Sequence, residues 1–530
     1  MKRKAKRIMT FALATVTVLS VLAFSGCRDK ETVNMTNDNY RTFYQIFVGS
    51  FSDSNGDGIG DIRGIINRFD YLNDGKANSK KSLSVEGIWL SPIFPSPSYH
   101  KYDAKDYYSI DWRFGTEEDL KELIDLCEER NVKLILDLAI NHTSSEHEWF
   151  KRFKEARIAG DESSKYYDYY SCVTAKERVG GIAYQKIDGV DCYYECNFWG
   201  EMPELDFDNP EVREETLNIA KYYLDLGVDG FRFDAIKYIY LGDTKKNVEF
   251  WEWYMDELRA YKPDIYCVGE CWSGEGEILE YYGAMNCFNF AMSQAEGVVA
   301  SAAKGQSISK YTGYVESYQN KIEAKNSYGM VMPFLSNHDM DRIAGAFANE
   351  GYMRMAANLY LLCTGSPVIY YGEEIGMRGS RGSANTDANR RLAMLWGDDD
   401  IIRDPEGTTY SKDKQIDTTV AMQSEDENSL LNYYRSLINI RHKYPAIARG
   451  DYKALTGSNR NFGGFIVEYK GEKLGILHNT GTEALNVDIS SLNGLDGYEF
   501  KKICDSIGMG SAKLKGSVLT VDPQTSIILK

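Results

Sequence analysis

The stretch Asp229-Gly-Phe-Arg-Phe-Asp-Ala235 decides the fold class of this chain. It is a short run that follows the helix pattern of Pro210–Leu226 and precedes a second helix pattern over Asn247–Ala260. Alternation of a short strand with amphipathic helices predicts a parallel sheet covered by helices. The sequence therefore predicts an α/β fold.

Seven further apolar runs extend this pattern along the chain. They are Phe43–Phe51, Val85–Pro92, Lys133–His142, Asp264–Trp272, Cys287–Phe290, Gly329–Asp339 and Ser366–Glu374. Helix patterns between them include Thr116–Arg130 and Met353–Cys363. Eight strand–helix repeats predict a closed (β/α)8 TIM barrel, with its active site at the C-terminal ends of the strands.

Two segments depart from the repeat. Residues 143–208 are too long for an ordinary connection and are rich in Tyr, Gly and Cys, which predicts a subdomain inserted after strand 3, over the barrel mouth. Residues 445–530 carry short alternating runs separated by turn residues, which predicts a C-terminal antiparallel β-sandwich domain. The barrel then comprises residues 40–142 and 209–444.

Three predicted strand ends carry carboxylates, namely Asp234, Glu270 and Asp339. Strand periodicity puts Arg232 on the same face as Asp234, and a guanidinium beside a carboxylate keeps it ionised. Glu270 points inward by the same alternation, and burial near other acids raises the pKa of a carboxyl. One ionised and one protonated carboxyl are what a retaining glycosidase needs. The alternative is that these acids cap barrel strands or bind metal.

Together and in this order, the motifs resemble those of the α-amylase family, the family 13 glycoside hydrolases. Four regions carry the resemblance, on predicted strands three, four, five and seven: Asp137–His142, Gly230–Lys237, Val268–Trp272 and Ser336–Asp339. The resemblance implies that Asp234 is the nucleophile, Glu270 the acid/base and Asp339 the transition-state stabiliser.

The same resemblance assigns residues to the sugar-binding cleft. Arg232 would orient Asp234, and His142 and His338 would bind sugar hydroxyls. Tyr102 would stack beneath the reacting ring, and Lys237 would contact an acceptor-side sugar, although a solvated strand-end lysine is the alternative. A neutral α-glucan polysaccharide or oligosaccharide is the implied substrate.

Four features of the sequence bear on specificity. Exo-acting relatives place an Asp three residues before the stacking tyrosine, where this chain has Tyr99, so we expect endo attack. Ala235, in place of Val, follows the nucleophile and favours α-1,4 bonds. The segment Met202–Asp206 resembles the family's fifth region of the amylase and neopullulanase type. Arg342 follows Asp339 by three residues, as an Arg often does in exo-acting relatives, and this position favours exo attack.

The leading hypothesis is a retaining, endo-acting α-amylase acting on starch, glycogen and maltodextrins. The alternatives are an exo-acting α-glucosidase or oligo-1,6-glucosidase, a neopullulanase or a transglycosylase. A non-catalytic glycan-binding relative is a remote alternative, because such relatives typically lose catalytic carboxylates and all three are present here.

A candidate calcium loop follows the first predicted strand. Oxygen ligands alternate along it with glycines at the turns, a spacing that suits Ca²⁺. The expected ligands are Asp53, Asn55, Asp57, the Ile59 carbonyl and Asp61. The alternative is a solvated turn. Asn141 is expected to help form a second calcium site, where Tyr238 replaces the family's frequent His.

The N-terminal end predicts export. Five basic residues among the first seven precede an uncharged, largely apolar run over Ile8–Phe24, which is typical of a secretory signal. Small residues lead into Cys27, so residues 1–26 resemble a lipoprotein signal peptide and residues 27–39 a tether. The expected location is extracytoplasmic, on a membrane lipid anchor at Cys27. Ordinary signal cleavage with secretion, or a retained anchor helix, are the alternatives.

Composition excludes several classes. Hydrophobic residues make up 43% of the 530 and charged residues 26%, which excludes a disordered chain and a multi-span membrane protein. The formal charge of -17 opposes nucleic acid as a partner. Cys172, Cys192 and Cys196 share one irregular segment, where a disulfide is an open possibility.

Overall fold

The computed structural model describes residues 38–530. The predicted signal peptide, Cys27 and the tether up to residue 37 lie outside the described residues. Within residues 38–530, no helix has the length and apolar character needed to cross a membrane.

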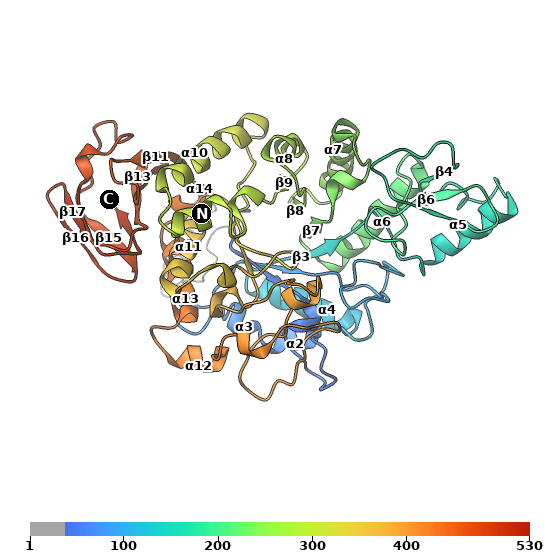
Figure 1. Ribbon diagram of the computed structural model, residues 1–530, viewed down its shortest axis with the longest axis horizontal. Helices are drawn as coiled ribbons and strands as arrows, with labels where there is room; N and C mark the ends of the chain where they lie inside the picture. Colours follow the sequence, from blue (N-terminus) through green and yellow to red (C-terminus); the bar gives the residue numbers. More distant parts are fainter. Residues whose placement is uncertain (1–37) are drawn as a thin grey trace, which may run out of the picture.

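A curled parallel sheet forms the centre of the molecule (Figure 1). Its seven strands run in the order β10-β1-β2-β3-β7-β8-β9. Their bounds are β1 Phe43–Ile46, β2 Gly87–Leu90, β3 Lys133–Leu138, β7 Gly230–Phe233, β8 Tyr266–Gly269, β9 Asn286–Cys287 and β10 Val368–Tyr370. Each strand is shorter than the apolar run that predicted it, because the final residues of each run form the loops at the barrel mouth.

The segment between β9 and β10 completes the barrel through two isolated β-bridges and not through a regular strand. Met332 pairs in parallel with Phe288 after β9, and Phe334 pairs with Val368 of β10. Pro333 lies between them and has no N–H to donate, which prevents a continuous ladder. The predicted strand over 329–339 is therefore reduced, but its two bridges join β9 to β10 and complete the TIM barrel.

The two faces of the sheet have separate cores. Phe43, Trp89 and Phe288 belong to a cluster inside the barrel. Phe231 and Phe233 of β7 face outward, and the Phe233 ring lies 4.8 Å from the Trp251 ring of helix α7. The alternation predicted for β7 is thus observed, and it leaves Arg232 inside the barrel.

Helices cover the outer face of the barrel. Thr116 caps α4 with reciprocal bonds to Asp119, and α6 begins with Pro210 and ends at Gly227 in the left-handed conformation. The helices outside the inserted subdomain are α2 Ile62–Asn67, α3 Phe69–Leu72, α4 Glu117–Glu129, α6 Pro210–Leu226, α7 Thr244–Tyr261, α8 Glu275–Glu280, α9 Val298–Ala303, α10 Ile308–Lys325, α11 Glu350–Leu361, α12 Val420–Glu425, α13 Leu430–Lys443 and α14 Ala446–Arg449.

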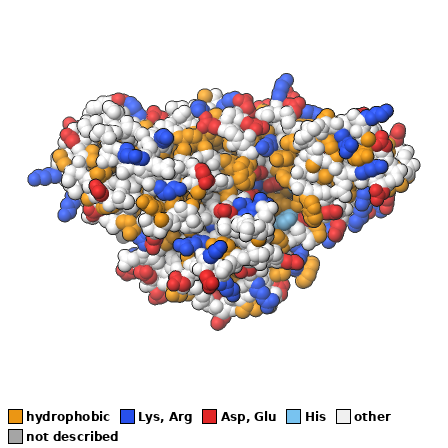
Figure 2. All heavy atoms as spheres, in the orientation of Figure 1, with side chains coloured by type: hydrophobic (Ala, Val, Ile, Leu, Met, Phe, Trp, Pro, Cys, Tyr) orange, Lys and Arg blue, Asp and Glu red, His pale blue; other side chains and the backbone are white. Residues whose placement is uncertain are grey.

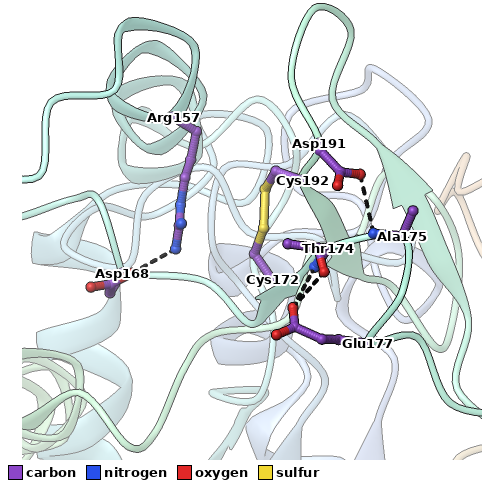
Figure 3. The surroundings of a disulfide bond; sticks show 8 residues. All are labelled: Arg157, Asp168, Cys172, Thr174, Ala175, Glu177, Asp191 and Cys192. Atoms are coloured by element: carbon purple, nitrogen blue, oxygen red, sulfur yellow. Dashed lines mark hydrogen bonds and ion pairs between the residues drawn. A yellow bond between two sulfur atoms is a disulfide. The ribbon is translucent and has the colours of Figure 1, made fainter.

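The segment after β3 forms the inserted subdomain, which lies at one end of the molecule (Figure 1). It contains α5 Glu148–Ala159 and a small sheet in the order β4-β6-β5, with β4 Cys172–Val173, β5 Tyr184–Lys186 and β6 Tyr193–Glu195. A disulfide joins Cys172 to Cys192 with 6.0 Å between the two Cα atoms, and Cys196 stays a buried free thiol (Figure 3).

The C-terminal domain lies at the opposite end and is a β-sandwich (Figure 1). Its sheets run β11-β12-β13-β18-β15 and β14-β17-β16, and the neighbouring strands in both sheets are antiparallel. Leu477 and Leu519, one from each sheet, share a core. The bounds are β11 Asp451–Thr456, β12 Phe462–Tyr469, β13 Glu472–Asn479, β14 Leu485–Asp488, β15 Ile503–Gly508, β16 Ala512–Lys515, β17 Val518–Val521 and β18 Thr525–Leu529.

Candidate active site

A cleft of about 1650 Å³ opens at the C-terminal ends of the barrel strands. Three parts of the chain line it: the loops after the strands, Phe198, Trp199 and Met202 of the inserted subdomain, and the segment 378–391 after β10. Figure 2 shows a recess near the middle of the molecule with hydrophobic side chains around it. The predicted site residues Asp234, Glu270 and Asp339 all line this cleft.

Arg232 is the centre of the charged groups at the cleft floor. Its side chain is fully buried, and its Nη1 lies 2.7 Å from Asp137 Oδ1 and 2.5 Å from Asp234 Oδ1. Its Nη2 lies 3.7 Å from Glu270 Oε2. A buried guanidinium is stabilised only where carboxylates surround it. Arg232 therefore connects the ends of β3, β7 and β8.

Glu270 follows β8 and has a raised pKa. Burial raises it to about 7, with the charges of Asp234 and Asp339 acting in the same direction, although Arg232 opposes them. Its Oε2 accepts a 2.8 Å hydrogen bond from the Ala235 backbone N–H. A carboxyl with such a pKa carries a proton near neutral pH, as a general acid must.

Asp339 has a lowered pKa, in contrast to Glu270. Burial alone would raise its pKa, but His338 and Arg391, together with Arg232, hold that pKa well below its usual range. His338 Nε2 lies 3.0 Å from Asp339 Oδ2, and Arg391 Nη2 lies 2.8 Å from Oδ1. Asp339 is therefore a carboxylate near neutral pH, where Glu270 carries its proton.

Tyr102 and His338 form a stacked pair beside these acids. Their ring centroids are 5.4 Å apart with an angle of 3° between the ring planes. The Tyr102 hydroxyl donates to Asp137 Oδ2 at 2.7 Å and lies 2.6 Å from His338 Nε2. The amide nitrogen of Gln45 lies 2.7 Å from the other ring nitrogen of His338 and fixes the ring orientation.

His142 and Lys237 line the same cleft from other loops. His142 is buried, which lowers its pKa, and its Nδ1 has no hydrogen-bond partner. Lys237 Nζ donates to the Trp272 carbonyl at 2.8 Å. The Trp272 ring is 44% exposed and stacks on Phe290 with 5.3 Å between centroids. An exposed aromatic face is thus held beside the acid-bearing loop.

Arg342 and Arg391 both line the cleft but contact different groups. Arg342 lines the cleft, but its Nη1 donates to the Tyr371 carbonyl at 2.6 Å and its Nε to the Arg390 carbonyl at 3.0 Å. Arg391, which sequence reasoning missed, contacts the Asp339 carboxylate, and Arg390 Nη1 donates to the Asp339 backbone carbonyl at 2.7 Å. Arg391 Nε also donates to the His338 carbonyl at 2.9 Å, and its Nη1 donates to the Tyr99 hydroxyl at 3.1 Å.

The predicted calcium loop forms a chain of turns. Asp53 Oδ1 accepts from the Asn55 and Gly56 amides, Asn55 Oδ1 from the Asp57 amide and Asp57 Oδ1 from the Ile59 amide. Asp61 caps α2 through Gly64. Within residues 38–530, no three His, Cys, Asp or Glu side chains gather to hold a metal ion by themselves. A cation here would need the Asn55 amide and the Ile59 carbonyl as well.

Asn141, expected at the second metal site, lies at the junction of the barrel and the inserted subdomain. Its side chain is 1% exposed, and neither its Oδ1 nor its Nδ2 has a hydrogen-bond partner. A buried amide without partners is costly, so a bound water or cation at this position would satisfy it.

Comparisons with known proteins agree with this geometry. A model of the α-amylase catalytic domain matches residues 45–450. "Alpha-amylase 3" of Dictyoglomus thermophilum is 37% identical over 496 residues, covering 92% of each chain. The oligo-1,6-glucosidase of Bacillus cereus is 29% identical over 530 residues, covering 82% of this chain and 89% of its own.

Among solved structures, Eubacterium rectale Amy13B is similar with a TM-score of 0.84 and 34% identity. The match covers 93% of this chain and 95% of that chain. The chain therefore belongs to the α-amylase family, whose members are glycoside hydrolases and transglycosylases.

Proposed function

We propose that this chain is a retaining, endo-acting α-amylase that hydrolyses the α-1,4-glucosidic bonds of starch, glycogen and maltodextrins. One observation carries the proposal. Asp234 and Glu270 meet at one buried guanidinium, where Asp234 makes the 2.5 Å contact and Glu270 keeps a pKa of about 7. That arrangement supplies a carboxylate nucleophile and a protonated acid in a single cleft.

The proposed reaction has two steps. Glu270 gives its proton to the glycosidic oxygen, the bond from that oxygen to the anomeric carbon breaks, and an oxygen of Asp234 bonds to the anomeric carbon. A water molecule then gives a proton to Glu270 and attacks the same carbon, which releases Asp234 and retains the α configuration. Asp339 accepts hydrogen bonds from sugar hydroxyls as the ring flattens, which stabilises mainly the transition state.

The remaining residues of the cleft floor bind the sugar in this proposal. Tyr102 stacks beneath the reacting ring, and His142 and His338 contact its hydroxyls. Lys237 contacts the acceptor-side sugar. Tyr99 continues the floor beyond the reacting ring, and Arg342 supports the loop that carries Asp339.

Endo attack is supported by the size and composition of the cleft. Its volume of about 1650 Å³ exceeds the roughly 300–1,000 Å³ of pockets that enclose one small ligand. Tyr99, which lines it, presents no carboxylate to hold a terminal sugar. Exo attack remains the alternative to be tested, because the chain is similar to an oligo-1,6-glucosidase. Transglycosylation is also tested, because the exposed Trp272 ring could bind an acceptor sugar.

A starch substrate blocked at its non-reducing ends tests the proposal. We expect rapid early loss of iodine staining relative to reducing sugar, with the blocked substrate still cut. Glucose alone, and none from blocked chains, would show exo attack. In a parallel assay that starts from maltoheptaose, products longer than maltoheptaose would show transglycosylation. No product in either assay would leave only a glycan-binding role.

We also propose that Ca²⁺ binds the Asp53–Asp61 loop through Asp53, Asn55, Asp57, the Ile59 carbonyl and Asp61. The ion would stabilise the native state, because the unfolded chain has no such site. Chelation should lower the melting temperature of the wild type, and Asp57→Ala should melt lower and respond less to chelator. If both proteins melt together with and without chelator, the loop is only a turn. Asn141 is the proposed contact of a second ion.

We propose an extracytoplasmic location with a lipid anchor at Cys27. The Cys172–Cys192 disulfide supports it, because disulfides form and persist mainly in oxidising compartments. In a host that processes lipoproteins, labelled palmitate should enter the wild type and not Cys27→Ser. An unlabelled mature wild-type protein would indicate a secreted enzyme.

A further inference from the structure

The turn that follows β7 contains a residue in an uncommon backbone conformation. Ala235 has φ 47° and ψ 46°, which is the left-handed region. Residues other than glycine adopt this region rarely, because the Cβ atom approaches the neighbouring carbonyl oxygen. Ala235 is buried and lines the cleft next to Asp234. Backbone strain of this kind persists only where the surrounding structure enforces it.

The left-handed conformation directs two backbone amides at Glu270. The Ala235 N–H donates to Glu270 Oε2 at 2.8 Å, and the Ile236 N–H donates to the Glu270 carbonyl at 3.0 Å. The turn therefore holds both the side chain and the main chain of Glu270. One carboxyl oxygen, Oε2, accepts a hydrogen bond, and the other, Oε1, does not take part in this contact.

Helix α7 holds the turn from the side away from the cleft. The indole N–H of Trp251 donates to the Ile236 carbonyl at 2.8 Å. The side-chain amide of Asn247 donates to the Lys237 carbonyl at 3.0 Å and to the Tyr240 carbonyl at 2.8 Å. Trp251 and Asn247 are both buried. These bonds supply the enforcement that the strained residue requires.

We propose that Ala235 is a positioning residue for Glu270, and that its left-handed amide selects Oε1 as the oxygen that carries the catalytic proton. Because Oε2 accepts the amide hydrogen, the proton resides on Oε1, passes from there to the glycosidic oxygen, and returns to Oε1 from water in the second step. The inference rests on the proposed role of Glu270 as the acid/base and adds the device that orients it.

The expected pH effect has a definite sign. The titratable or charged groups around Glu270 are Arg232, Asp234, Asp339, the Tyr238 hydroxyl and the Cys271 and Cys287 thiols. The hydrogen bond from the Ala235 N–H favours the ionised form of Glu270 and lowers the pKa of its carboxyl. Loss of that bond, with the other groups in place, therefore raises the pKa that limits kcat/KM on the alkaline side.

Two substitutions at position 235 separate conformation from size. Ala235→Gly adopts the left-handed region freely and should keep the wild-type alkaline limb, whatever its kcat/KM. Ala235→Val places a branched side chain in the left-handed region and should shift the alkaline limb upward by roughly half a pH unit. Because Val at this position also bears on linkage preference, the pH limb on a single α-1,4-linked substrate is the readout for both variants. Trp251→Phe removes the bond behind the turn without placing any new atom in the cleft, and should shift the limb in the same direction.

The decisive measurement uses substituted phenyl α-maltotriosides of similar size but different leaving-group pKa. A leaving group of low pKa needs little protonation, so a misplaced acid makes the rate depend more steeply on leaving-group pKa. We expect a steeper dependence for Ala235→Val and Trp251→Phe than for the wild type and Ala235→Gly. A uniform loss across the series, or a shift of the pH limb equal in Gly and Val, would overturn the positioning role. An inactive wild type would instead overturn the proposed function.

Discussion

This barrel holds two pairs of acids that follow its strands and differ in the groups that surround them. Asp234 and Glu270 end β7 and β8, and Glu373 and Glu374 follow β10. Burial raises the pKa of Glu270 to about 7 and that of Glu373 to about 8. A raised carboxyl pKa alone therefore does not distinguish a catalytic acid from a structural one.

The neighbours make the difference. Glu373 Oε1 accepts from the Tyr360 and Tyr434 hydroxyls at 2.6 and 3.0 Å, and Glu374 Oε1 accepts from Tyr44 at 2.7 Å and from another tyrosine. Neither acid is among the residues that line the cleft. The proposed catalytic pair, Asp234 and Glu270, instead shares Arg232 and lines the cleft. Tyrosine hydroxyls satisfy a buried acid and link packed elements, whereas the buried Arg232 guanidinium contacts two acids that line the cleft.

The largest predicted effect is on the catalytic pair. Asp234→Asn and Glu270→Gln should each lower turnover by at least ~10³-fold with the fold intact, which is the scale of losing one member of a group that acts as a unit. Glu373→Gln is the matched control and should stay within a few-fold of wild type. Turnover of maltoheptaose with circular dichroism measures both. If a folded Asp234→Asn or Glu270→Gln variant keeps a tenth of the activity, the proposed catalytic acids do not differ from the structural acid Glu373.

Arg391 should come next. Arg391→Met removes the cation from Asp339 and should lower kcat by about 10²-fold, comparable to the loss of one preorganised donor. Arg391→Lys should recover part of this loss, since it keeps the charge but not the forked contacts. Arg342→Met, whose native side chain bonds backbone carbonyls, should affect the melting temperature more than kcat. Equal kcat for all three would show that the Asp339 contact has no role.

The pH dependence of kcat/KM should follow Glu270. The acid must be protonated, so activity should fall about tenfold per pH unit above a pKa of about 7. Glu373→Gln should leave this limb unmoved, because Glu373 is not in the cleft. If the alkaline limb moves in Glu373→Gln, the limb does not report the titration of Glu270.

The smallest effect is on stability. The folded pKa of Glu373, about 8, lies above its unfolded value, so its contribution to stability is present in acid and is lost as pH rises through about 8. Glu373→Gln has no such group and should melt roughly 2–4 °C above the wild type at pH 9. At pH 5 the difference should disappear or reverse. Parallel melting curves at both pH values would contradict the assignment.

Sequence patterns predicted the regular part of this structure well. The apolar runs located the barrel strands, and Pro210 with Gly227 predicted α6 with its observed ends. Helix α10 was missed although its buried residues recur every three or four positions, because several of them are tyrosines and the helix reads as polar. The strand predicted over 329–339 is longer than the structure shows, because Pro333 interrupts its hydrogen-bond ladder.

The site was predictable where a motif sits on a strand and less so elsewhere. Asp234, Glu270 and Asp339 converge because the C-terminal ends of parallel strands meet at one edge. Arg391 belongs to a segment of turns and short 3-10 helices far from Asp339 in the sequence, and no local period indicates that it approaches Asp339. The left-handed conformation of Ala235 was likewise invisible, since alanine does not mark such a turn.

Closure of the barrel by β1 and β10 also constrains how the chain is made. Phe43 pairs with Val368, and just before them Arg41 bonds Ser366 across 325 residues of sequence. During synthesis the first strand therefore emerges long before its partner, and its unpaired edge must wait. A nascent chain arrested before residue 368 should be rapidly degraded by proteases, whereas one arrested after residue 450 should be resistant. The barrel can therefore close only after the segment around residue 368 has been made.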